Sequence, residues 1–265
     1  MRNCSTCRRR DIGRAMSAFD AVAPDFDRGR LLPSGVAEAV RSAILASIDA
    51  PGRPRVLDLG AGTGRIGKAF VAAGDAYFGA DLSFGMLREF FPYSRNLVQT
   101  EGEQLPFSSG TFDVVMLIHV LSGSRGRRRL LAEARRVLRP EGVLAVGQTV
   151  SPPEGIDAQL KKRLAAILED MAVEPHRSKG RDEALSWLES ASRRRLTVVA
   201  ASWNARRTPR DFLVRHRTGA RFSALPAEIQ GDALERLGVW AEAAFGSLDA
   251  DFAEDRRFEL NMFKF

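Results

Sequence analysis

The chain has 265 residues, of which 45% are hydrophobic and 28% are charged, a balance typical of a globular protein with a packed core. Its longest nearly uncharged stretch, residues 114–123, is shorter than the about 20 residues that a membrane helix needs. No apolar segment near the N-terminus resembles a signal peptide. We therefore expect a soluble cytoplasmic protein with no membrane partner.

The net charge is +7, and 35 of the 40 basic residues are arginine. Basic clusters lie at residues 8–10, 125–129, 135–136 and 193–195. They are scattered along the chain and are not joined to aromatic residues on which bases could stack. We therefore expect no specific nucleic-acid partner, and we keep an RNA acceptor open as an alternative because of the charge.

The first 13 residues read as a disordered basic tail that contains the only two cysteines, Cys4 and Cys7. A structural zinc site needs four ligands, and the nearest histidine along the chain is His119. The spacing C-x-x-C also occurs in redox motifs, but those lie where a strand meets a helix, whereas this pair precedes any periodic segment. We expect no metal site.

Strands and helices are predicted to alternate from residue 14 to residue 150. Apolar residues recur at helical spacing from Val36 to Ile48, after a candidate cap at Ser34. Such alternation is typical of a parallel sheet with helices on both faces. The predicted strands are 55–59, 76–82, 95–102, 112–121 and 143–150. The predicted helices between them are 64–74, 85–91 and one within 127–142 that ends before Pro140 and Gly142.

The pattern changes after residue 150. We expect mostly helix over 156–192, a strand at 196–203, a helix capped by Thr208 and a longer helix over 226–246. The chain then ends in a strand. These elements predict a single domain over 14–265, with a disordered tail over 1–13. Its core is 52–150 plus strands near 196–203 and 256–265, and its helical cap comes from 14–50, 151–192 and 204–250.

Three glycines follow the first predicted strand in "VLDLGAGTGRIG", residues 56–67. Glycines between a strand and a helix let the backbone approach a bound cofactor closely. Dinucleotide sites use G-x-G-x-x-G, but here the spacing is G-x-G-x-G and Arg65 holds the next position. Asp58 would be unfavourable beside a pyrophosphate. It suits a cofactor that carries an amino group and a positive sulfur.

At this point the sequence resembles the class I S-adenosylmethionine-dependent methyltransferases, over about residues 14–150. "VLDLGAGTG" looks like their first motif, "GADLS" like their second, and "EGEQLPF" like their G-D-A-E-x-L-P-F segment. "FDVV" and "RVLRPEGVL" match the motifs of the fourth and fifth strands. The resemblance implies a Rossmann-like, doubly wound α/β fold with a mostly parallel seven-stranded sheet and helical lid additions.

The resemblance also implies S-adenosylmethionine as cofactor. Asp81 would accept both ribose hydroxyls, Glu101 the adenine amino group, and the Gly102 backbone N–H would reach the ring. Glu101 stands where the family usually has Asp. The expected cofactor-binding residues are Asp58, Gly60, Ala61, Gly62, Gly64, Asp81, Leu82, Met86, Glu101, Gly102 and Glu103.

The expected function is methyl transfer to a small-molecule O, N or C nucleophile. "FDAVAPDFD", residues 19–27, resembles a segment that precedes the core in small-molecule members, with Phe26 in place of Tyr. His119 is the candidate catalytic residue, either as a base or as a lining side chain. An acidic acceptor held by Arg206, Arg207 and Arg210 stays open. A non-catalytic regulator that binds S-adenosylmethionine also stays open as an alternative. The sequence does not determine the oligomeric state.

Overall fold

The computed structural model describes residues 17, 19–48, 52–121, 126–173 and 180–265. Within these residues seven strands form one sheet in the order β3-β2-β1-β4-β5-β7-β6. The strands β3, β2, β1, β4 and β5 pair in parallel, whereas β7 runs antiparallel to both β5 and β6. Their bounds are β1 (Arg55–Leu59), β2 (Ala76–Asp81), β3 (Leu97–Gln99), β4 (Phe112–Ile118), β5 (Leu138–Val150), β6 (Arg194–Arg207) and β7 (Phe252–Lys264).

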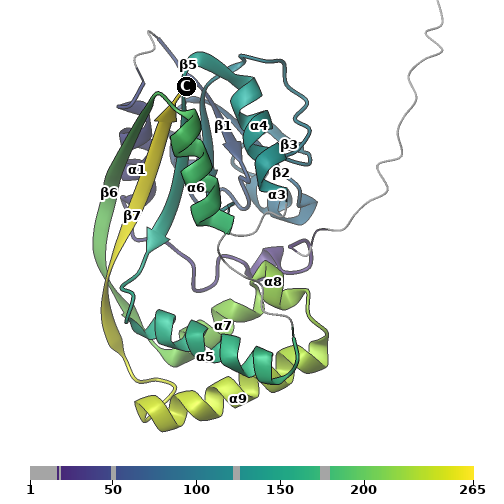
Figure 1. Ribbon diagram of the computed structural model, residues 1–265, viewed down its shortest axis with the longest axis vertical. Coiled ribbons are helices and arrows are strands. Elements are labelled where there is room, and N and C mark those ends of the chain that lie inside the picture. Colours follow the sequence, from purple (N-terminus) through teal and green to yellow (C-terminus); the bar gives the residue numbers. More distant parts are fainter. Residues whose placement is uncertain (1–16, 18, 49–51, 122–125, 174–179) are drawn as a thin grey trace, which may run out of the picture.

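The strand order places a topological switch point between β1 and β4. From β1 the chain winds outward through β2 to β3, and then returns to the other side of β1 with β4. In open α/β sheets, ligands bind beyond the carboxyl ends of the strands at such a point. The predicted doubly wound, Rossmann-like sheet is therefore confirmed (Figure 1). Its topology places the expected ligand site at the loops after β1 and β4.

Helices cover both faces of the sheet (Figure 1). One face carries α1 (Val36–Leu45), α2 (Gly67–Ala72) and α3 (Phe84–Phe90), which share a buried cluster with the strands. The other face carries α4 (Arg127–Val137) and α6 (Gly180–Ala191). A sheet covered on both faces requires apolar residues on both sides of each central strand. This explains the continuous run "FDVVMLI" of β4, which is almost entirely buried.

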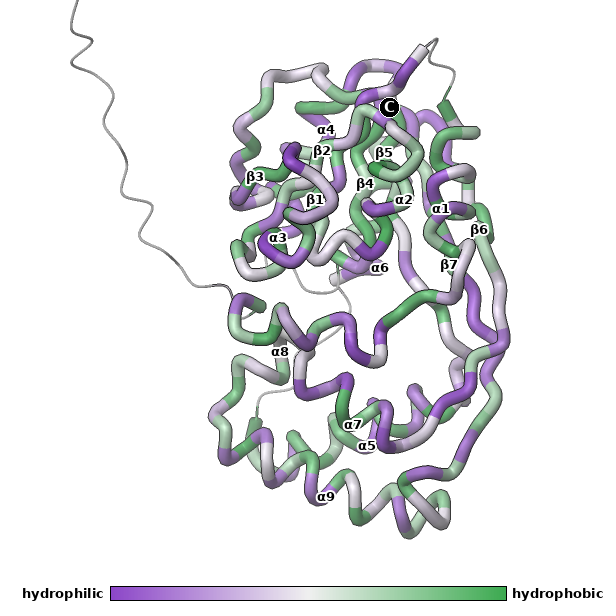
Figure 2. Tube along the Cα trace, turned by 180° about the vertical axis from the view of Figure 1, so that it is seen from behind, coloured by the Kyte–Doolittle hydropathy of each residue, from purple (hydrophilic) through white to green (hydrophobic). Residues whose placement is uncertain are grey.

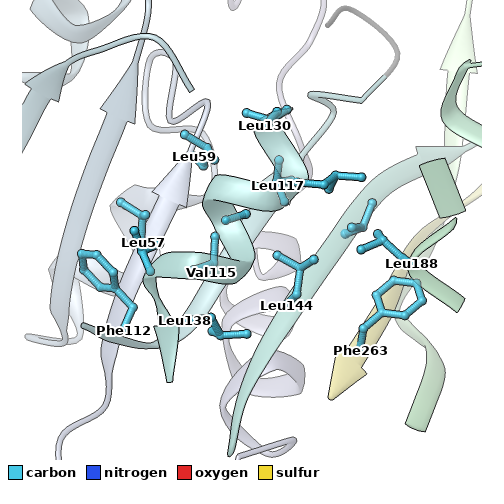
Figure 3. Close-up of a cluster of buried hydrophobic side chains, with 14 of the residues drawn as sticks. Leu57, Leu59, Phe112, Val115, Leu117, Leu130, Leu138, Leu144, Leu188 and Phe263 are labelled. Atoms are coloured by element: carbon cyan, nitrogen blue, oxygen red, sulfur yellow. The ribbon is translucent and has the colours of Figure 1, made fainter. Parts of the chain in front are cut away.

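Figure 3 shows how the central strands pack against the helices of the second face. Leu57 of β1, Leu117 of β4 and Leu144 of β5 are buried with Leu130 of α4 and Leu188 of α6. Burying one such leucine side chain contributes roughly 1.5–3 kcal/mol. Packing on both faces holds the carboxyl ends of β1 and β4 in fixed register with each other.

The remaining helices form a cap beyond the carboxyl ends of the strands (Figure 1). The cap helices are α5 (Ile156–Asp170), α7 (Pro209–Arg217), α8 (Ala220–Ser223) and α9 (Ala227–Phe245). They have a hydrophobic cluster of their own, which includes Leu160, Phe212 and Leu237. In Figure 2 the cap helices alternate between hydrophilic and hydrophobic residues, as expected for helices with one buried side.

Several element ends confirm or correct the predictions from sequence. Thr208 caps α7 through a capping box, as predicted, and Gly246 ends α9 in the left-handed conformation. Gly35, not Ser34, stands at the N-cap of α1. The helix predicted to end before Pro140 ends at Val137, because pairing with β4 begins at Leu138.

Some predictions fall on residues outside this description. The tail 1–13 with Cys4 and Cys7 lies there, so its predicted disorder stays a prediction. Among the residues that the structure does describe, no helix is long and apolar enough to cross a membrane. The same part of the chain contains no group of three or more His, Cys, Asp or Glu side chains that could hold a metal ion.

Candidate functional site

The loop after β1 is held against the end of β2. The backbone N–H groups of Gly60 and Ala61 both donate to the carbonyl oxygen of Ala80, at 2.7 and 3.1 Å. Gly60 has a φ of +90°, and a Cβ at this position would overlap the side chain of Val120. Gly62 has a φ of +56°, and a Cβ there would meet nothing within 4 Å. Gly60 is thus required by packing, whereas Gly62 presents bare backbone to open space.

The remaining glycine of the motif, Gly64, has a φ of +79° and abuts Phe90 of α3. The following helix, α2, begins only at Gly67, three residues later than the sequence predicted. The chain therefore continues as a loop through Arg65, and the loop rather than the helix carries the backbone that faces open space.

Asp58, in β1, is a buried carboxylate with one oxygen unpaired. Only 3% of its surface is exposed, and its Oδ2 accepts a hydrogen bond from the Tyr77 hydroxyl at 2.8 Å. Its Oδ1 has no partner among the described residues. Burial raises the pKa of Asp58 to about 7, opposed by the Tyr77 hydrogen bond and reinforced by the charge of Asp81. A buried acceptor without a partner costs free energy and marks a place for a donor from a ligand.

Asp81, the last residue of β2, joins the glycine loop to the start of α3. Its Oδ2 accepts from the Gly62 N–H and its Oδ1 from the Ser83 N–H, both at 2.8 Å. Burial raises the pKa of Asp81, and these two hydrogen bonds oppose the increase. Each carboxylate oxygen accepts more than one hydrogen bond, so both keep a lone pair for a ligand hydroxyl.

The other predicted cofactor residues lie in different surroundings. Leu82 is 45% exposed, beside Asp81, whereas Met86 is a buried residue of α3. Glu101 and Gly102 follow β3, and Gly102 abuts Leu130 of α4. Glu103 lies against Gly126 and pairs with Arg129 at 3.7 Å, so its carboxylate is directed toward α4. The structure thus joins the glycine loop to Ala80 and Asp81 at the end of β2, and Tyr77 of the same strand holds Asp58.

His119 directly follows β4, at the switch point. Its φ is +60°, unusual for a residue other than glycine, and its N–H donates to the Gly147 carbonyl at 2.9 Å. Its ring meets Phe258 edge-on, and its Nε2 accepts from the Thr149 N–H at 3.4 Å. The ring is reached by solvent but crowded by protein, which lowers its pKa together with nearby positive charges. His119 is therefore neutral at pH 7.

Residues 17–32 reach the glycine loop and α3, a contact that the sequence analysis did not predict. The Asp20 carboxylate accepts from the Ser83 hydroxyl at 2.6 Å and from the Gly85 N–H at 2.9 Å. The Asp27 carboxylate accepts from the Thr63 hydroxyl at 2.8 Å. Both acidic residues lie in "FDAVAPDFD", whose resemblance to a family segment was the one available signal.

The same segment also contacts the cap. The guanidinium of Arg30 donates to the Arg215 carbonyl at 2.6 Å and to the Thr218 hydroxyl. Its own carbonyl accepts from Arg65, in the glycine loop, at 2.7 Å. Arg30 therefore connects the loop after β1 with α7, so the segment lies between the site and the cap.

The chain is similar to known methyltransferases over its core. Residues 57–146 match the family model described as "Methyltransferase domain". A demethylmenaquinone methyltransferase from Streptomyces griseus is 32% identical over 143 residues, which cover 51% of this chain and 60% of that protein. The ubiquinone/menaquinone biosynthesis C-methyltransferase UbiE from Syntrophotalea carbinolica is 32% identical over 151 residues, covering 54% of this chain and 64% of that protein. The chain thus spans about 60% of the length of these relatives.

Solved structures of other proteins share the fold of this chain. The YcgJ protein from Bacillus subtilis superposes with a TM-score of 0.53 at 16% identity, covering 86% of this chain and 99% of that one. A SAM-dependent methyltransferase from Thermotoga maritima gives 0.53 at 14% identity, covering 94% and 99%. Residues 57–146 thus match a methyltransferase domain, and S-adenosylmethionine is the cofactor that such a match implies.

Proposed function

We propose that this protein transfers the methyl group of S-adenosylmethionine to a small-molecule O, N or C nucleophile. Two observations carry the proposal: the buried Oδ1 of Asp58 has no partner among the described residues, and Gly62, four residues later in the loop after β1, presents bare backbone to open space. These groups fit the cofactor, whose amino group needs an acceptor and whose body needs close backbone approach. When bound, S-adenosylmethionine supplies an electrophilic methyl group on a positively charged sulfur.

In this proposal the residues of the loop and of β2 hold the cofactor. Asp58 Oδ1 accepts from the amino group, and the remaining lone pairs of Asp81 accept from the ribose hydroxyls. The exposed side chain of Leu82 covers the ribose edge, and Met86 supports it from the core. Glu101 and Gly102 bind the adenine. Glu103 contributes less to cofactor binding, because its carboxylate already pairs with Arg129.

The small-molecule acceptor is supported by the cap. Helices α5 and α7 lie beyond the carboxyl ends of the strands, and residues 17–32 connect α7 to the glycine loop (Figure 1). Such a cover excludes water and aligns two small reactants, which is the main requirement of a methyl transfer. The family match ends at residue 146, before the cap, so it does not identify the acceptor. We propose that core and cap act together as one domain.

The cofactor assignment is tested with Asp81→Ala. Removing a charged acceptor of two hydroxyls is expected to cost at least about 1.5–3 kcal/mol of binding free energy, or roughly ten- to a hundredfold in Kd. Isothermal titration calorimetry with S-adenosylhomocysteine measures this loss, and NAD should not bind. Asp182→Ala, on the surface of α6, is the matched control. Unchanged affinity in the Asp81 variant would remove this residue from the site.

The part that His119 takes is tested with His119→Asn. Its neutral ring directs Nε2 at the Thr149 N–H, so we expect it to position reactants and not to accept a proton. The variant should lose modest activity and keep the shape of the pH–rate profile, measured as S-adenosylhomocysteine production with a panel of phenols, amines and enolisable carbon acids. A loss of ~10²–10⁴-fold with a vanished limb near neutral pH would make His119 a general base.

The same assays separate the alternatives. A regulator would bind S-adenosylhomocysteine but produce none with any acceptor. An RNA methyltransferase would bind its RNA tightly and selectively at physiological salt, whereas scattered arginines give only weak, salt-dependent association.

A further inference from the structure

A segment that precedes α1, residues 19–32, is bound to the start of α3 next to Asp81. We call this segment the strap. Its Asp20 carboxylate accepts from the Ser83 hydroxyl and from the Gly85 N–H, and a Cβ at Gly85 would lie 2.8 Å from the backbone of Asp20. The N–H of Ser83 in turn donates to Asp81. The strap therefore holds one of the two backbone groups that position the proposed ribose acceptor.

The strap is also bound to the glycine loop. Its Asp27 carboxylate accepts from the hydroxyl of Thr63, a residue that is 3% exposed and directly follows Gly62. Arg65 donates from its guanidinium to the backbone carbonyl of Arg30 at 2.7 Å, and its Nε lies 3.9 Å from Asp27. Contacts that a cofactor makes with the loop are therefore passed to the strap at Asp27 and Arg30.

The Arg30 side chain reaches in the other direction, to the end of α7. Its two terminal nitrogens donate to the Arg215 carbonyl at 2.6 Å and to the Thr218 hydroxyl, and this hydroxyl also donates to the Arg215 carbonyl at 3.0 Å. The Arg215 carbonyl is one of the last four of α7, which have no acceptor role within the helix. A positive group at this end of a helix is favourable. Arg30 thus acts as a cap for α7, supplied from 185 residues earlier in the chain.

The guanidinium of Arg30 is fixed in direction as well as in position. It also donates to the Phe26 carbonyl at 2.7 Å and lies 4.4 Å from the centre of the Phe26 ring. Burial lowers the pKa of Arg30 to about 10, helped by repulsion from Arg65 and Arg215, so the group stays charged at pH 7. A planar guanidinium that donates to several oxygens admits one orientation, unlike an ion pair on the surface. The distance between the strap and α7 is therefore set by this side chain.

The position of α7 determines that of the neighbouring cap helix. Phe212 of α7 is buried with Leu160 of α5 and Leu237 of α9, and Arg215 pairs with Asp157 of α5 at 2.7 Å. A helix packed in this way moves together with its neighbours. The contacts from Thr63 through the strap to α7 thus join the proposed cofactor site to the cap as a continuous set.

We propose that Arg30 is a positioning residue that couples the cofactor site to the cap, so that the cap closes over the acceptor once the cofactor is bound. This inference rests on the proposed function and adds an order of binding to it: cofactor first, acceptor second. S-adenosylmethionine contacts the glycine loop and so stabilises the arrangement in which loop, strap and α7 are joined. The acceptor then binds under a cap that is already aligned with the methyl group.

Hydrogen exchange of backbone amides, followed by mass spectrometry with and without saturating S-adenosylhomocysteine, tests the coupling on the full chain. In the parent protein, peptides of the glycine loop should exchange more slowly with the ligand, which shows that the site is occupied. Peptides of α7 should also slow, by at least about fivefold, the lower end of an ordinary coupling between two sites.

Matched variants locate the coupling in Arg30. In Arg30→Gln the glycine loop should still slow on ligand binding, but the slowing of α7 should fall below about twofold. The ratio of exchange rates with and without ligand decides, since a purely structural loss speeds α7 in both states and leaves this ratio unchanged. Arg28→Gln is the control: Arg28 is an exposed strap residue that pairs with Asp25 at 3.0 Å, and the ratio should stay at the parental value.

Thr218→Val approaches the same contact from the cap and leaves the strap intact. It removes one of the two α7 acceptors of Arg30, so the slowing of α7 should be smaller than in the parent and larger than in Arg30→Gln. If Arg30→Gln does not fold, this variant decides.

Three results would overturn the inference: α7 exchange in the parent that does not respond to S-adenosylhomocysteine, a parental ratio in the deciding variant, or an equal loss of the ratio in Arg28→Gln. A glycine loop in the parent that does not respond to the ligand is a separate result. It would overturn the proposed function, and this inference with it.

Discussion

Replacing Asp157 by alanine is expected to destabilise the protein by about 3–5 kcal/mol, the usual effect of removing one partner of a buried ion pair. The carboxylate is 3% exposed and pairs with Arg215 and Arg256, whose side chains are also largely buried. Its removal leaves the buried guanidinium of Arg215 without a counter-charge and leaves that of Arg256 with only Glu254, 3.5 Å away. Since a domain is stable by about 5–15 kcal/mol in total, the loss is a large share.

Urea unfolding of the parent and the variant measures this loss. Asp249→Ala, which removes the partner of the exposed Arg210, is the control and should leave the midpoint unchanged. Asp157→Ala combined with Arg215→Met should recover part of the loss, because the cation that lost its only ion-pair partner is removed as well. A loss no larger than that of the control would show that the cap does not depend on this pair.

The ion pair also has a pH signature. Burial alone would raise the pKa of Asp157, but the charges of Arg215 and Arg256 hold it below its ordinary value of 3.8. A carboxyl with a lowered pKa stabilises the fold above its unfolded pKa, and this contribution is lost as the pH falls through the folded pKa. The difference between parent and variant should therefore shrink only below about pH 4.

Local patterns made much of the fold predictable. The capping box of Thr208 and Asp211 depends on residues three apart, so the start of α7 could be predicted. The glycine loop could be predicted because three alternating glycines weaken regular structure and are favoured where backbone must bend sharply or approach a ligand. The end of α4 could not be predicted in this way, because strand pairing of Leu138 with Phe112 competes with helix formation there.

The rest of the candidate site depends on contacts between distant segments. Tyr77 reaches Asp58 from the neighbouring strand, and Asp20 reaches Ser83 across more than sixty residues. No local sequence pattern records these contacts, because the two partners of each hydrogen bond lie in different segments of the chain.

The second large effect is expected from Asp58→Asn. Burial raises the pKa of Asp58 from 3.8 to about 7, so the folded protein holds a proton that the unfolded chain releases. A raised pKa gives stability that is fully present below 3.8 and is lost as the pH rises through about 7. At about 1.4 kcal/mol per pKa unit, the whole loss amounts to about 4 kcal/mol.

Asparagine cannot ionise, so the variant should lack this decline. Relative to the parent, its free energy of unfolding should increase by about 2–3 kcal/mol between pH 5 and pH 8. Its amide can still accept from the Tyr77 hydroxyl, but its NH₂ would be a buried donor, so the variant starts from lower stability at pH 5. Thermal unfolding at the two pH values measures the change, and parallel curves would contradict it.

Cofactor binding should show the opposite preference. In the proposed site the ionised Asp58 accepts from the cofactor's amino group, so the parent protein should bind S-adenosylhomocysteine more tightly as the pH rises through about 7. Asp58→Asn should lose this rise and bind at least roughly tenfold more weakly at pH 8, since a charged acceptor is worth about 1.5–3 kcal/mol. Calorimetry in two buffers of different ionisation enthalpy detects the proton released on binding. If the variant gains stability and keeps its affinity, the unpaired oxygen of Asp58 does not face the cofactor, and the amino group is held elsewhere.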